Sequence, residues 1–150
     1  MEINKLFFSE ISPVLTIYDK VKILGLTDER VRYLQNNYIK EFTIKENEYV
    51  AAKEIIIESD NVVGTIRRIG KTISWYDFLD ENCHKDNTIC RFNKEEFDSV
   101  LLNQQTDGLP SVIKVEDEYY IAGNGLHRLT MAKCLGGKRA RVILKEKIRK

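Results

Sequence analysis

The chain has 150 residues, enough for one domain with a substantial buried core or for a small domain with a helical extension. Hydrophobic residues make up 43% and charged residues 31%, a composition that excludes a disordered chain, and the net charge of +1 neither favours nor excludes nucleic acid as a partner. No apolar run approaches the roughly 18 residues that span a bilayer, and no signal-peptide pattern opens the chain. Since the three cysteines have no disulfide-framework spacing, we expect a cytoplasmic protein with reduced thiols and no membrane partner.

The first 45 residues have helical patterns. Short helices are expected over residues 4–11 and 14–24, the second ended by Gly25. A clearer helix begins at Thr27, a good N-cap, and its apolar residues repeat at helical spacing: Val31, Leu34, Tyr38 and Phe42. We therefore predict a helical N-terminal extension over residues 1–45, whose helices are the candidate surface for a protein partner.

From residue 46 onward the patterns alternate between strand and helix. β-branched residues predict strands, serine and asparagine caps predict helices, and an acidic turn predicts a hairpin. The expected strands are 54–58, 61–69, 88–92, 111–115, 119–122 and 139–144, and the expected helices are 74–79, one from Asn93 to about Gly108, and 126–135. Residues 46–150 therefore predict a compact α+β domain.

The strand-to-helix corner after Ile121 carries the clearest chemistry. Gly123 and Gly125 allow dihedrals that other residues avoid and let a ligand approach the backbone, and Asn124 tolerates left-handed geometry. His127 and Arg128 fall in the first helical turn, where a cation is unfavourable for the helix alone, so an anion is expected beside them. These five residues predict a phosphate site. The alternative is a glycine-rich turn in which Arg128 pairs with a nearby carboxylate.

The stretch from Ile113 to Leu144 resembles the ParB/sulfiredoxin superfamily. It has a strand, a Gly-x-His-Arg corner at Gly125–Arg128, a helix with Ala132 in its middle and Leu-Gly at its end, and a closing strand. The resemblance implies a small mixed sheet with packed helices, and a corner that binds the phosphates of CTP or ATP, with Mg²⁺ as a further expected cofactor. Because partition proteins of this family occur on plasmids, phages and conjugative elements, it also implies DNA maintenance or transfer of a mobile element.

Two departures from the family narrow the expected activity. Leu126 stands where sulfiredoxins carry a reactive cysteine and where partition proteins commonly have Glu, so sulfinic-acid reductase activity is not expected. Asn124 replaces the acid of the free-serine kinases, and an amide is a poor Mg²⁺ ligand and no general base. This pattern favours a nucleotide or nucleic-acid binder over an efficient phosphotransferase.

Two basic clusters are candidate nucleic-acid contacts. Arg67, Arg68 and Lys71 lie near two aromatic residues, an arrangement that suits single strands, although a solvated strand edge gives the same pattern. After Gly136, seven basic residues accompany one acid, so contacts with a phosphate backbone are expected from Lys138, Arg139 and Arg141. A frayed, solvated chain end is the alternative for this second cluster.

Two other functions stay open. An ATP- or CTP-dependent phosphotransferase, an NTPase or a weak nuclease of the same fold would need acids for Mg²⁺, from Glu116–Glu118 or elsewhere. An interaction module would use the N-terminal helices and have an inactive pocket. Cys83, His84 and Cys90 lack a fourth ligand and a paired C-x-x-C motif, so no metal site is predicted from them.

Overall fold

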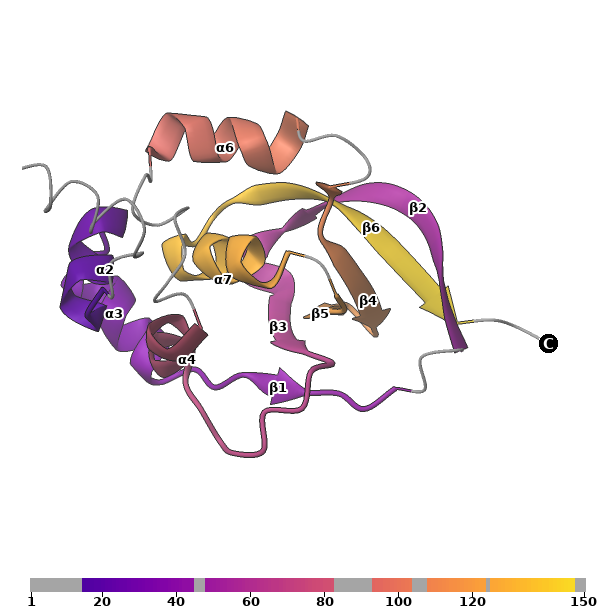
Figure 1. Cartoon of the computed structure of the whole chain (residues 1–150), viewed down its shortest axis with the longest axis horizontal. Coiled ribbons are helices and arrows are strands. Elements are labelled where there is room, and N and C mark those ends of the chain that lie inside the picture. Colours follow the sequence, from indigo (N-terminus) through magenta and orange to yellow (C-terminus); the bar gives the residue numbers. More distant parts are fainter. Residues whose placement is uncertain (1–14, 45–47, 83–92, 104–107, 124, 148–150) are drawn as a thin grey trace, which may run out of the picture.

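The computed structural model of the chain describes residues 15–44, 48–82, 93–103, 108–123 and 125–147. They form a six-stranded mixed sheet with helices packed on it, which confirms the expected α+β class (Figure 1). The helices are α2 (Ile17–Leu24), α3 (Asp28–Gln35), α4 (Trp75–Asn82), α6 (Lys94–Asn103) and α7 (Leu126–Leu135), and a 3-10 turn, η2, covers Ser59–Asn61. The strands are β1 (Lys40–Glu41), β2 (Tyr49–Glu58), β3 (Val62–Thr65), β4 (Ser111–Val115), β5 (Glu118–Ile121) and β6 (Arg139–Lys147).

The strand order is β1-β3-β5-β4-β6-β2, and the direction of the strands divides the sheet into two parts. β1, β3 and β5 run parallel to one another, with Thr65 opposite both Glu41 and Ile121. β4 returns antiparallel to β5, β6 is parallel to β4, and β2 is antiparallel to β6. The carboxyl ends of β1, β3 and β5 therefore meet at one edge of the sheet, next to the start of β4.

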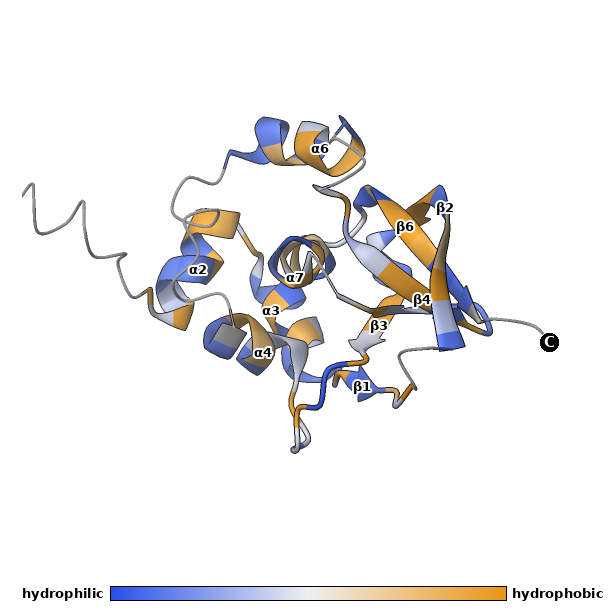
Figure 2. Ribbon diagram, turned by 45° about the vertical axis from the view of Figure 1, so that its right-hand side comes forward, coloured by the Kyte–Doolittle hydropathy of each residue, from blue (hydrophilic) through white to orange (hydrophobic). Residues whose placement is uncertain are grey.

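The helices cover one face of the sheet, and α7 is the central one. Figures 1 and 2 show α7 between the sheet and the helices α2, α3 and α4, and seven of its ten residues are buried. The shared core joins helical residues to sheet residues: Leu24, Leu34, Phe78, Leu79, Phe97, Leu101, Leu129, Val62, Val112, Ile121, Val142 and Leu144. A smaller apolar cluster on the opposite face contains Ile113, Tyr120 and Ala122, covered in part by Phe42 and Tyr49.

Most predicted elements from residue 46 onward are confirmed. The hairpin, the helix over 126–135 and the closing strand are present, and β6 continues to Lys147 because it pairs with β2 along its whole length. Ser74 caps α4 by accepting a hydrogen bond from the Asp77 amide at 3.1 Å, and Asn93 caps α6 in the same way. The alternative that the basic tail is a frayed chain end is wrong for residues 139–147, because these residues form β6. The predicted helix over 4–11 and strand over 88–92 lie outside the described residues.

The predicted helix through Phe42 is wrong, because α3 ends at Gln35. Asn36 and Asn37 donate side-chain hydrogen bonds to the carbonyls of Arg32 and Tyr33 at 2.7 and 2.6 Å, and so satisfy the last turn of the helix. The chain then becomes extended and forms β1. Two consecutive asparagines thus end a helix whose apolar periodicity continues for two more turns.

The described part of the first 45 residues packs on the same core as the rest of the chain. Leu24 and Leu34 are buried in the shared core. The ammonium of Lys20 is fully buried and donates to the carbonyls of Leu79 and Asp80 at 2.9 and 2.6 Å, in the last turn of α4. A cation at this end of a helix satisfies carbonyls that have no partner within the helix and interacts favourably with its dipole. In the described ranges, no helix has the length and apolarity that crossing a membrane requires.

A second set of cations holds the carboxyl end of α7. Arg30 donates to the carbonyls of Cys134 and Lys133 at 2.9 and 2.5 Å. Lys133 is buried, donates to the carbonyl of Asp60 at 2.9 Å, and lies 5.7 Å from the centre of the Trp75 ring. Burial lowers the pKa of Lys133, and the nearby Asp60 opposes this effect only in part. These contacts fix the direction of α7, and hence the position of its amino end.

The lowered pKa of Lys133 predicts a pH-dependent stability. Between the pKa of Lys133 in the folded chain and its ordinary value of 10.5, the unfolded chain binds more protons at this group, so the free energy of unfolding gains from this group as pH rises. We expect the difference in unfolding free energy between wild type and Lys133→Met to increase in favour of wild type through this window, and to be flat below it. Urea unfolding at several pH values measures it. Lys22→Met, at an exposed position of α2, is the control, and an equal slope for both variants would contradict the prediction.

Candidate functional site

The parallel strands bring two predicted regions to the same sheet edge. The Ile66 amide donates to the Ile121 carbonyl at 3.0 Å, so the segments that follow β3 and β5 leave the sheet side by side. Arg67 and Arg68 are exposed in the first of these segments, and the Arg67 amide is held by the Thr65 hydroxyl at 3.0 Å. The carboxyl ends of parallel strands are where ligands bind in many α/β proteins. Arg67 and Arg68 therefore follow the strand that neighbours β5, which leads into the predicted phosphate corner.

Gly125 is the N-cap of α7 and is required by the fold. Its φ of 90° lies in the left-handed region, and a Cβ atom at this position would lie 2.4 Å from the Pro110 Cβ. The Leu129 amide donates to the Gly125 carbonyl at 2.9 Å and so begins the helical hydrogen-bond ladder. Glycine has no side-chain acceptor for the first-turn amides, and the first turn of α7 contains no acidic residue. Within α7, no acidic side chain therefore balances the positive end of the helix dipole.

Gly123 differs from Gly125 because neither sterics nor a positive φ requires a glycine there. A Cβ at Gly123 would meet only the Lys145 ammonium nitrogen at 3.9 Å and the Ser111 Cβ at 4.0 Å. The residue is exposed, and its neighbour Ala122 is fixed by an amide hydrogen bond to the Ser111 carbonyl at 2.8 Å. The backbone at Gly123 is thus held in place and open to solvent. A glycine at such a position permits a ligand to approach the main chain closely.

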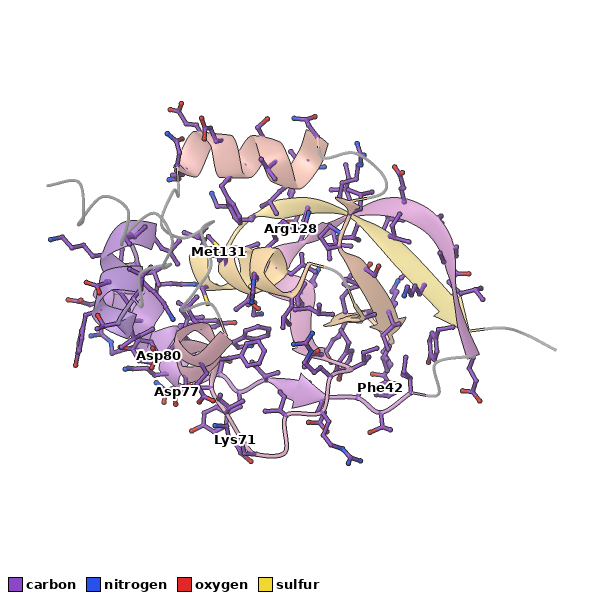
Figure 3. The ribbon with its side chains drawn as sticks, in the orientation of Figure 1. Phe42, Lys71, Asp77, Asp80, Arg128 and Met131 are labelled. Carbon is purple, nitrogen blue, oxygen red and sulfur yellow. The ribbon has the colours of Figure 1, made fainter. Side chains whose placement is uncertain are left out.

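The two basic residues of the predicted site lie in the first turn of α7. His127 is exposed, whereas Arg128 is half-buried near the start of this central helix (Figure 3). Burial lowers the pKa of Arg128 from its ordinary value, although a guanidinium stays charged in proteins. Arg128 and His127 each have an interaction partner within the chain, so the first turn of α7 is tied to its surroundings. Asn124 lies outside the described residues.

The other predicted nucleic-acid contacts are largely engaged within the chain. The Lys71 ammonium lies 2.8 Å from Glu81, and that of Lys138 lies 2.8 Å from Asp98. Arg141 lies 3.5 Å from Glu54 and donates to the carbonyl of Leu102 at 3.4 Å, while Arg139 is exposed on β6. The exposed cations of the two basic clusters are therefore Arg67, Arg68 and Arg139, together with Lys71, which remains accessible in its surface pair.

The acidic turn Glu116–Glu118 lies away from the corner. It connects the end of β4 to the start of β5, whereas Gly123 follows the end of β5. Residues 119–122 separate Glu118 from Gly123, and five extended steps between them span about 16 Å. In the described ranges, no three or more His, Cys, Asp or Glu side chains are grouped so that they could hold a metal ion. The carboxylates of this turn therefore do not supply ligands for the expected Mg²⁺ at the corner.

Comparison with protein-family models, with curated proteins and with solved structures finds no match to the chain. The likeness to the ParB/sulfiredoxin superfamily therefore rests on the sequence motif around the corner and on the order of elements about it.

Sequence reasoning missed Lys145 and Ser111 as neighbours of the corner. They reach it because β6 lies parallel to β4, with Lys145 opposite Ile113 in that pairing. The register between two strands that are separated by a helix has no local sequence signal. Only the alternation of Val142, Leu144 and their neighbours indicates that Lys145 faces away from the helices.

The same substitution at the two corner glycines is predicted to have different effects on stability. Gly125→Ala places a Cβ against Pro110 and strains a left-handed backbone, so we expect it to lower the free energy of unfolding by roughly 1–3 kcal/mol or more. Gly123→Ala is the matched control, with an expected change within about 0.5 kcal/mol. Denaturant unfolding of both variants tests this difference. Equal stability of the two would show that the Gly125–Pro110 contact does not constrain the fold.

Proposed function

We propose that the chain is a phosphate-binding module, which binds a nucleotide or the backbone of nucleic acid at the Gly123–Arg128 corner. One observation carries the proposal: the open backbone at Gly123 and the basic first turn of α7 lie where parallel strands end, and no acidic residue occupies that turn. Backbone amides at a helix start bind phosphate oxygens, and cations beside them strengthen those hydrogen bonds.

Binding is favoured over catalysis by what surrounds the corner. Phosphoryl transfer needs a metal ion held by acids, or a base that orients the nucleophile. The nearest acidic cluster in sequence, Glu116–Glu118, is at the opposite ends of β4 and β5, and residue 124 is an amide where free-serine kinases have an acid. A phosphotransferase, NTPase or nuclease remains the second reading, and Mg²⁺-dependent product formation from ATP or CTP would establish it.

The resemblance to partition proteins extends the proposal to DNA maintenance or transfer of a mobile element in the cytoplasm. Arg67 and Arg68 support a nucleic-acid partner because they are exposed at the same edge as the corner. A third reading is a protein-interaction module. Exposed aromatic residues near the N-terminal helices favour that reading, since Tyr18 is 80% exposed and Tyr38 is 56% exposed.

Nucleotide binding is tested by replacing the half-buried cation of the corner. We expect wild type to bind CTP or ATP and Arg128→Ala to lose about 10- to 100-fold in affinity, because one charge-assisted hydrogen bond contributes about 1.5–3 kcal/mol. Isothermal titration with each nucleotide, with and without Mg²⁺, measures the affinity and the metal requirement.

Two controls separate binding from folding. Arg32→Ala removes an exposed cation from α3 and should bind as wild type does, and His127→Ala tests the corner at an exposed position whose removal disturbs little packing. Nucleotide affinities that are equal in wild type, Arg128→Ala and His127→Ala would reject the corner as the nucleotide site.

A DNA partner is tested by salt dependence. If Arg67 and Arg68 contact phosphates, the double substitution to Gln should weaken DNA binding uniformly across sequences and reduce the slope of log K against log salt by about 2. The matched control is Lys22→Gln with Arg32→Gln, two exposed cations on the helical side of the molecule. Fluorescence anisotropy at several salt concentrations provides the slopes, and an unchanged slope in the Arg67 and Arg68 variant would argue against contact there.

A further inference from the structure

Lys145 is a half-buried cation that has no hydrogen bond or ion pair among the described residues. It lies on β6, between Ile113 of β4 and Ala51 of β2. Its nitrogen approaches Gly123, at 3.9 Å from the position that a Cβ there would occupy.

The lack of a hydrogen bond or ion pair distinguishes Lys145 from the other described lysines and arginines that are not exposed. Across the described ranges, every other lysine or arginine that is not exposed has a hydrogen-bond, ion-pair or electrostatic partner in the chain: Lys20, Arg30, Arg128, Lys133, Lys138 and Arg141. Among the described residues, Lys145 is therefore the exception to the rule that a lysine or arginine withdrawn from solvent has an interaction partner in the chain. A charge that is partly removed from water without an acceptor is unfavourable.

The structure around Gly123 indicates what would serve as the acceptor. Ser111, on the neighbouring strand, also lies beside Gly123, and no hydrogen bond of its hydroxyl is found in the described part of the chain. A lysine and a serine thus border a backbone position whose glycine the fold does not require. An ammonium and a hydroxyl are both donors, and a phosphoryl group presents several acceptor oxygens to them.

We propose that Lys145 binds a phosphoryl oxygen in front of Gly123, with the Ser111 hydroxyl as a second donor. This assignment rests on the proposed function and adds residues from β6 and β4 to the corner on α7. The bound phosphoryl group then contacts cations from two separate elements, the first turn of α7 and the strand β6. Lysine acts here as a compact charge beside the open main chain of residue 123.

The experiment compares Lys145→Gln with Lys114→Gln, which removes an exposed lysine from the adjacent strand β4. The probes are CTP, ATP, inorganic pyrophosphate and duplex DNA, each titrated at fixed ionic strength. We expect Lys145→Gln to lose at least about tenfold in affinity, Lys145→Arg to keep most of it, and Lys114→Gln to bind as wild type does. Loss for the small phosphates alone assigns the phosphoryl group to a nucleotide, and loss for DNA alone assigns it to a nucleic-acid backbone.

The outcomes separate this inference from the proposed function. If Arg128→Ala loses affinity while Lys145→Gln and Ser111→Ala bind as wild type does, the assignment of Lys145 is overturned and the corner stands. If wild type binds none of the probes, the proposed function fails, and the assignment fails with it. If Lys145→Gln and Lys145→Arg lose affinity equally and both unfold at lower denaturant concentration than Lys114→Gln, the amine has a structural role only, which also overturns the assignment.

Discussion

The contact between Gly125 and Pro110 fixes where α7 begins, and the corner depends on that position. Pro110 precedes β4, so the start of the helix is held against the start of a sheet strand. At the other end of α7, Arg30 donates hydrogen bonds to the carbonyls of Lys133 and Cys134. The Lys133 ammonium donates to the carbonyl of Asp60. Because both ends are fixed, the first-turn amides have a defined direction at the sheet edge, as a preorganised anion site needs.

Basic side chains that are withdrawn from solvent lie in two different environments in this fold. On the helical side, buried ammonium groups such as Lys20 are satisfied by main-chain carbonyls at helix ends, where the dipole is negative. At the corner, His127 and Arg128 lie at the positive end of a helix, and Lys145 approaches the preceding backbone. The first arrangement is complete within the chain. Of the three basic residues at the corner, only Lys145 has no hydrogen bond or ion pair among the described residues, and a cation in that state can receive an anion from solvent.

The sequence predicted the elements whose boundaries have chemical markers. Ser74 and Asn93 mark helix starts, Gly25 and Gly136 mark helix ends, and the corner was placed correctly between β5 and α7 because glycines surround it. The end of α3 was missed, because an apolar periodicity continued past two asparagines that satisfy the last carbonyls. The approach of Lys145 to the corner was also beyond sequence reasoning, since strand order and register depend on packing over the whole sheet.

The placement of Lys145 on β6 has a consequence for how binding competence would arise during folding. β6 follows α7 in the chain and lies between β4 and β2 in the sheet. Both of its pairings join parts of the chain that are far apart in sequence. Contacts of such large sequence separation form late, because the intervening loops must first be closed. Until β6 pairs with β4, the start of α7 lacks this lysine, so the proposed affinity for an anion would be complete only once the sheet has closed.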